Sequence, residues 1–82
     1  MKIRTSATNK LNFCGPVVRR LRSEKGWSQE RFAGKCQING WDASRDVIAR
    51  IELQNRIVTD WEIVSLGKAL GCAPGDLLTG DL

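Results

Sequence analysis

The sequence has no histidine, and its three cysteines never occur in a C-x-x-C pair. Zinc sites in proteins are built mainly from Cys and His ligands in closely spaced pairs, so we expect no metal site. Cys14, Cys36 and Cys72 lie far apart, which fits free thiols in a reducing cytoplasm. We interpret Cys36 and Cys72 as small buried apolar residues, whereas Cys14 can be either buried or exposed.

Other absences exclude whole classes of protein. The sequence has no histidine, no paired carboxylates in a plausible cleft and no glycine-rich phosphate loop, so we expect no enzyme, no catalytic residue and no cofactor. No apolar run approaches the ~20 residues of a membrane span, and the N-terminus lacks an apolar signal-peptide region. We therefore expect a cytoplasmic protein without a membrane partner. Strand-like alternation and internal repeats are also missing, which favours an all-α fold.

Basic side chains are in excess, and they are unevenly placed along the 82 residues. Residues 1–58 hold twelve lysines and arginines against five acids, whereas residues 59–82 hold one against four. A chain of this length makes one small domain, and its excess of positive charge favours polyanions such as DNA as partners. The alternative is a solvated surface that is basic without any function.

Capping residues and apolar spacing predict a compact bundle of four to five short helices. Ser28 is a good N-cap, because its hydroxyl can accept a hydrogen bond from an orphan backbone N–H. Gly26 can end the preceding helix in the left-handed conformation, and Thr59 with Glu62 has the pattern of a capping box. The expected helices begin at Gly15-Pro16, run over 29–37 and about 44–53, extend from Thr59 to Gly71, and end with a short turn over 73–78.

Two segments lie outside these helices. Residues 1–13 form a polar, basic N-terminal arm, either a disordered terminus or a functional one, which Phe13 can pin to the body. Trp41 lies in the connector between the second and third helices, and we expect it to fold back onto the core. Asp42 and Ser44 compete for the N-cap of the third helix.

From Gly15 to Leu78, the chain resembles the phage repressor and Cro-type family of helix-turn-helix proteins, often called Xre-like. The matching residues are Leu21-Arg22, Gly26, Ser28-Gln29-Glu30, Phe32-Ala33, Ile48, Ile51-Glu52, Ala69-Leu70-Gly71 and Asp76-Leu77-Leu78. The resemblance implies a lambda-repressor-like helix-turn-helix DNA-binding domain over residues 14–82. It also implies a sequence-specific transcriptional regulator, a small repressor, that places its third helix in the major groove of double-stranded DNA.

Carried over residue by residue, the resemblance implies two groups of DNA contacts. Arginine suits guanine, because it donates two hydrogen bonds to the O6 and N7 atoms. Asp46 either accepts a hydrogen bond from cytosine N4 or holds Arg45 or Arg50 in place. The base-reading residues would be Arg45, Asp46, Ala49 and Arg50. The phosphate-contacting residues would be Gln29, Ser44, Asn55, Arg56 and Arg19, with Asn55 in the left-handed conformation that often ends a helix.

The resemblance also implies a partly buried salt bridge between Arg22 of the first helix and Glu52 of the third. The chain departs from the family in the connector between its second and third helices. This connector is about five residues longer than the common pattern, and the extra length can tilt the third helix.

Repressors of this family commonly bind an inverted-repeat operator as homodimers. We expect leucines at the C-terminal end, among Leu77, Leu78 and Leu82, to pair two subunits. The alternative function is a protein-interaction module of antitoxin or adaptor type that uses the same fold, because a fold does not determine a function.

Overall fold

Five helices account for most of residues 10–79, the part of the chain that the structure, a computed structural model, describes. They are α1 (Gly15–Glu24), α2 (Gln29–Ile38), α3 (Arg45–Glu52), α4 (Asp60–Leu70) and α5 (Pro74–Thr79). No strand occurs within this range, so the prediction of an all-α fold is confirmed. Most of the expected N-terminal arm, together with Leu82, lies outside the described residues.

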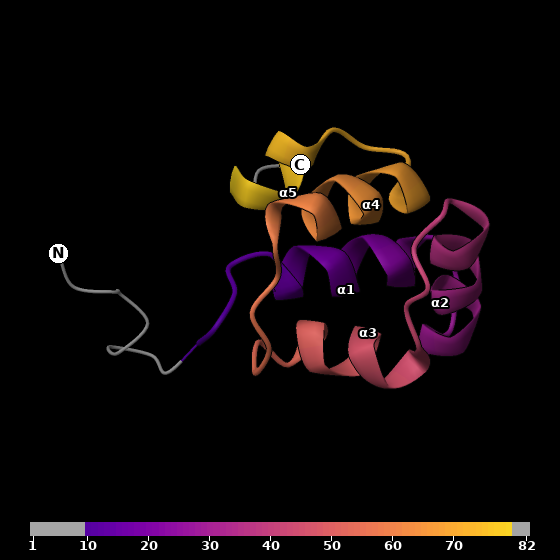
Figure 1. Cartoon of the computed structure of the whole chain (residues 1–82), viewed down its shortest axis with the longest axis horizontal. Helices are drawn as coiled ribbons and strands as arrows, with labels where there is room; N and C mark the ends of the chain where they lie inside the picture. Colours follow the sequence, from indigo (N-terminus) through magenta and orange to yellow (C-terminus); the bar gives the residue numbers. More distant parts are fainter. Residues whose placement is uncertain (1–9, 80–82) are drawn as a thin grey trace, which may run out of the picture.

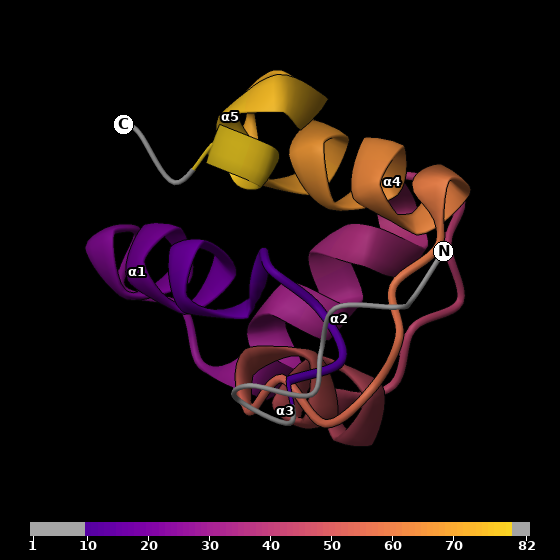
Figure 2. The same cartoon turned by 90° about the vertical axis from the view of Figure 1, so that its left-hand side faces the viewer.

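The helices are arranged around α1. In Figures 1 and 2, α3 lies on one side of α1, while α4 and α5 lie on the opposite side. The remaining helix, α2, crosses one end of this stack and contacts both α3 and α4. The outer face of α3 is therefore remote from α4 and α5.

The core is formed by the apolar faces of all five helices. Val18, Phe32, Ile48, Leu66 and Leu77 are fully buried, one from each of the five helices. Two further positions were left open or assigned wrongly from the sequence. Cys14 is buried, and burial raises the pKa of its thiol to about 11. Cys72, expected to be buried, is only half-buried at the surface before α5.

The helix ends follow the local chemistry of the sequence. The hydroxyl of Ser28 accepts a hydrogen bond from the Arg31 backbone N–H at 3.0 Å. Ser44, rather than Asp42, caps α3, because its Oγ accepts from the Val47 N–H at 3.2 Å. The capping box is present at the start of α4, with Thr59 as N-cap. Each cap pairs one of the N–H groups that the first turn of a helix leaves without a partner.

The connector from α2 to α3 is packed onto the core rather than looping away from it. The indole of Trp41 is half-buried against the core, as expected. Ala43 is fully buried, and its carbonyl accepts a hydrogen bond from Gln37 Nε2 at 2.8 Å. The Trp41 N–H also donates to the Cys36 carbonyl at 2.9 Å. These contacts fix where α3 begins.

Two expectations about the ends of α1 and α3 were wrong. Phe13 does not pin the segment before α1, because its side chain is 64% exposed. Asn12 does so instead, because its Nδ2 donates to the Ile51 carbonyl in the last turn of α3 and to the Arg56 carbonyl in the loop that follows. After α3, the left-handed residue is Gln54, with φ of 63°, and not Asn55. The Gln54 N–H bonds to the Ile51 carbonyl at 3.0 Å, so the chain turns one residue earlier than the sequence suggested.

Within the described residues, no helix is long and apolar enough to cross a membrane.

Candidate nucleic-acid interface

The outer face of α3 carries two exposed arginines. Ile48 and Ile51 are fully buried, and the 3.6-residue period turns Arg45, Asp46 and Arg50 to solvent. Ala49, on the same helix, is half-buried. Three of the four residues expected to read bases are therefore accessible on one short helix, and the fourth lies at its edge.

Asp46 and Arg50 are joined by an ion pair on this face. Arg50 Nε lies 3.1 Å from Asp46 Oδ2, one helical turn away, and the two side chains are 61% and 68% exposed. The expectation that Asp46 holds an arginine therefore agrees with the geometry. An exposed pair of this kind contributes little to stability, about 0.3–0.5 kcal/mol, so Arg50 can leave it for a stronger partner. Within residues 10–79, Arg45 has no ion pair at all.

A buried ion pair anchors α3 to α1. Arg22 Nε donates to Glu52 Oε2 at 2.6 Å and Nη2 donates to Oε1 at 3.0 Å, with the side chains only 14% and 3% exposed. A third donor, Nη1, bonds to the Trp27 carbonyl at 2.7 Å. The hydrogen bonds to Glu52 raise the pKa of Arg22 above its ordinary value. Arg22 and Glu52 thus form the salt bridge that the resemblance implies, and Arg22 belongs to the scaffold.

Gln29 takes part in the same cluster. Its Nε2 donates to Glu52 Oε1 at 3.0 Å, so the first residue of α2 is bonded to the last residue of α3. We expected this side chain at a phosphate, but one of its donors points inward to Glu52. A primary amide has a second N–H and a carbonyl oxygen, which leave Gln29 some capacity for an outside ligand.

An open hollow brings several of the expected site residues together. It has a volume of about 280 Å³ and is lined by Arg19, Gln29 and Ala49, together with Arg22, Glu52 and Leu53. A neighbouring hollow of about 470 Å³ contains both Arg19 and Arg20. Both arginines are exposed and, within the described part of the chain, neither forms an ion pair. Arg19 was the only residue of α1 named as a contact from the sequence, and Arg20 follows it directly in the same helix.

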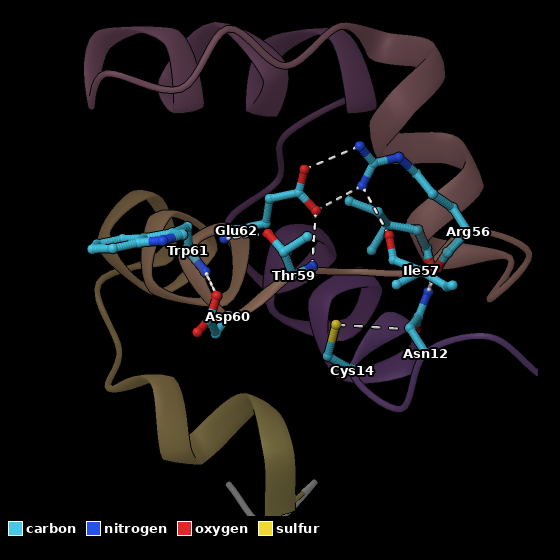
Figure 3. A network of polar contacts seen from close by, with 9 residues as sticks. Asn12, Cys14, Arg56, Ile57, Thr59, Asp60, Trp61 and Glu62 are labelled. Carbon is cyan, nitrogen blue, oxygen red and sulfur yellow. Dashed lines mark hydrogen bonds and ion pairs between the residues drawn. The ribbon is translucent and has the colours of Figure 1, made fainter. Parts of the chain in front are cut away.

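Arg56 is bound elsewhere. Its guanidinium donates to both oxygens of Glu62, at 2.8 and 3.0 Å, and to the Ile57 carbonyl at 3.2 Å (Figure 3). The hydrogen bonds between the two side chains raise the pKa of Arg56 and lower that of Glu62. The guanidinium that we expected at a phosphate is therefore committed to the N-terminus of α4. The pairing could not be predicted from the sequence, because it depends on the path of the loop between α3 and α4.

The two remaining phosphate candidates lie at opposite ends of α3. Ser44 is exposed at the N-terminus, where its oxygen accepts a bond from Val47 but its O–H can still donate. Asn55 is exposed beyond the C-terminus. Arg19 and Arg20 of α1 lie beside the C-terminal end of α3, where they line a hollow with Glu52 and Leu53. Exposed guanidinium groups and uncharged donors of this kind suit contacts with a polyanion.

No group of three or more His, Cys, Asp or Glu side chains that could hold a metal ion occurs among residues 10–79.

Comparisons with protein-family models, with curated proteins and with solved structures find no match for this chain. An all-α domain is therefore what the observations establish, and the resemblance to phage repressors stays a prediction.

Proposed function

We propose that this protein is a sequence-specific DNA-binding transcriptional regulator, a small repressor with the helix-turn-helix fold, which places α3 in the major groove of double-stranded DNA. The observation that carries the proposal is the outer face of α3, where Arg45 and Arg50 are exposed on a helix whose other side is fully buried. Arginine is the most frequent reader of guanine in the major groove.

The anchoring of α3 supports the same function. Base reading requires side chains held on a rigid element, within a fraction of an ångström of their productive geometry. The Arg22–Glu52 pair ties the C-terminal end of α3 to α1, and Gln37 of α2 bonds to the carbonyl of the buried Ala43, just before α3 begins. Gln29 adds a bond from α2 to the same carboxylate. The helix is therefore fixed at both ends, while its outer face stays open.

The surroundings of α3 supply the phosphate contacts in this account. Arg19 and Arg20 would contact the backbone beside the groove, with Ser44 and Asn55 as uncharged donors. A single eight-residue helix reads few base pairs, so we propose a homodimer on an inverted-repeat operator. The protein would act in the cytoplasm, where its cysteines stay reduced.

A second candidate function, a protein-interaction module of antitoxin or adaptor type, is supported by a different surface. Trp61 of α4 is 80% exposed and lines a small hollow with Asp60 and Val64. Tryptophan is enriched at protein interfaces, so this apolar surface could bind another protein. It lies away from α3, and a partner there would not by itself exclude DNA.

The decisive experiment is selection of bound sequences from a pool of random duplex DNA, followed by affinity measurements between about 50 and 200 mM salt. We expect enrichment of one sequence arranged as an inverted repeat. If about four charge contacts form per subunit, the slope of log affinity against log salt would be about −3.6 per subunit. Failure to enrich any sequence, with an affinity that does not change with salt, would leave the protein-interaction module as the better account.

A further inference from the structure

Two helix ends and a loop meet around the side chain of Asn12. Its Oδ1 accepts a hydrogen bond from the Gly15 N–H at 2.8 Å, at the start of α1. Its Nδ2 donates to the Ile51 carbonyl in the last turn of α3 at 3.0 Å, and to the Arg56 carbonyl at 2.9 Å. Figure 3 shows Asn12 beside the loop that carries Arg56 toward Glu62 of α4. One amide thus bonds to α1, to α3 and to the loop that leads into α4.

Neighbouring bonds hold Asn12 in this place. The Leu11 N–H donates to the Gln54 carbonyl at 2.9 Å, and Gln54 Nε2 donates back to the Asn12 carbonyl at 3.1 Å. Gln54 can make both bonds because its left-handed backbone turns the chain back toward residue 12. The segment before α1 is therefore bound to the C-terminal end of α3.

The backbones of α1 and α3 also approach closely at this point. A Cβ atom on Gly15 would overlap the carbonyl oxygen of Ile51, the same oxygen that accepts from Asn12. The last carbonyls of a helix lack partners within the helix, and here an outside amide supplies one. The Asn12 side chain therefore fixes the distance between the start of α1 and the end of α3, because it bonds to both.

We infer that Asn12 is a positioning residue for base recognition, which sets how α3 lies relative to α1 and hence to DNA. The inference rests on the proposed function. Helix α3 has only eight residues, too few to be stable alone, so its orientation depends on its neighbours. Arg19 and Arg20 of α1 would grip the backbone while Arg45 and Arg50 of α3 read bases. Asn12 joins the two helices that carry these groups.

Substitutions can remove the amide donor of Asn12 while they keep an oxygen acceptor. Asn12→Ser keeps an oxygen that can accept from the Gly15 N–H, and serine is a good N-cap, but it loses both amide donors to Ile51 and Arg56. Asn12→Asp also keeps the acceptor and loses the donors, while it adds a negative charge. That charge weakens binding to every DNA sequence alike, so it cancels in a ratio of affinities.

The experiment measures the ratio of affinity for the selected DNA site to affinity for scrambled DNA, well below the melting temperature. We expect Asn12→Ser and Asn12→Asp to lower this ratio about tenfold, which lies within the net contribution of the two hydrogen bonds that are lost. The control is Ile63→Val, which trims the core on α4 and should destabilise the fold without changing the ratio. Gln54→Gly suits the left-handed backbone and removes only the bond to the Asn12 carbonyl, so it should lower the ratio less while the protein stays folded.

The outcomes separate the two claims. If the wild type selects a site and the Asn12 and Gln54 variants keep the full ratio, Asn12 is not a positioning residue and the proposed function stands. The inference is also overturned if Ile63→Val lowers the ratio as much as Asn12→Ser, because loss of stability alone then explains the effect. If the wild type itself does not distinguish the two DNAs, the proposed function fails, and the inference fails too because it rests on that function.

Discussion

Glu52 is the only charged residue that is buried among residues 10–79, and Arg22 neutralises it through two hydrogen bonds. We predict that Arg22→Ala lowers the free energy of unfolding by about 3 kcal/mol or more, since it strands a buried carboxylate. Gln29 would then be the remaining side-chain partner of Glu52 among the described residues. Denaturant unfolding measures the effect, with Arg20→Ala as the control because Arg20 is exposed and unpaired in the same helix.

Replacing both Arg22 and Glu52 by leucine should recover much of this loss, because a matched apolar pair leaves no stranded charge. An unchanged unfolding midpoint for Arg22→Ala would mean that the pair is solvated.

The Glu62 carboxylate should make the stability of the protein depend on pH in the acid range. Hydrogen bonds from Arg56, and then from the Thr59 N–H, lower the pKa of Glu62 below its ordinary value of 4.5. A lowered pKa in the folded state gives stability that is present above pH 4.5 and is lost as the pH falls through the folded value. Glu62→Gln can still accept from the Thr59 N–H, so it keeps the helix cap.

We therefore expect the melting temperature of wild type to exceed that of Glu62→Gln at pH 7, and the two curves to converge below pH 4.5. Thermal melts across this pH range give the measurement. Parallel curves at every pH would show that the Arg56–Glu62 pair does not stabilise the fold.

At the scale of single elements, the helix boundaries were predictable because the signals are local. Ser28, Thr59 and Gly71 cap or end their helices through bonds within a few residues in sequence. The position of α3 was not predictable in the same way. It depends on Asn12, whose partners Ile51 and Arg56 lie 39 and 44 residues away, and on the left-handed turn at Gln54.

The residues of the candidate site differ in the same way: some contacts follow from local pattern, and others depend on how the helices pack. The exposed face of α3 follows from helical periodicity, so Arg45 and Arg50 could be named from the sequence. The Arg22–Glu52 pair was implied by the family resemblance. The pairing of Arg56 with Glu62 was not predicted, because it requires the path of the connecting loop. Gln29 was only partly understood, since its bond to Glu52 requires the packing of α2 against α3.

The close approach of α1 to α3 predicts that Gly15 tolerates no side chain. Gly15→Ala places a methyl group against the Ile51 carbonyl, and we expect it to destabilise the fold by about 1–3 kcal/mol. The matched control is Gly34→Ala, within α2, where a Cβ meets open space and alanine should instead stabilise by about 0.5–1 kcal/mol. Chemical denaturation of both variants tests the pair. Equal stabilisation by the two substitutions would contradict the close approach.

At the scale of the whole molecule, α3 and the C-terminal helices lie on opposite sides of α1. Exposed arginines lie on α3 and on the adjoining turn of α1. Helices α4 and α5 lie on the opposite side, and they belong to the acidic part of the sequence. Of the two described C-terminal leucines, Leu77 is fully buried in the core and Leu78 is half exposed. The expected subunit contact can therefore use Leu78 but not Leu77.

We predict dimerisation through this end of the molecule, weak in solution and firm on DNA. Sedimentation over a range of protein concentrations, with and without the selected DNA, should show two subunits per inverted repeat. Leu78→Ser should weaken cooperative binding to the two half-sites without unfolding the core, because this side chain is half exposed. A strict monomer on a single half-site would contradict the dimer.

The central claim, that α3 reads base sequence, is tested most directly by the ratio of affinities for the selected DNA and for scrambled DNA in three variants. We predict that Arg45→Ala and Arg50→Ala each lower the difference in binding free energy between the two DNAs by about 1–3 kcal/mol. Lys68→Ala removes the same charge from the exposed surface of α4 and should leave this difference unchanged. If the two arginine variants stay folded but lose affinity for both DNAs in equal proportion, α3 does not read bases and the account is wrong.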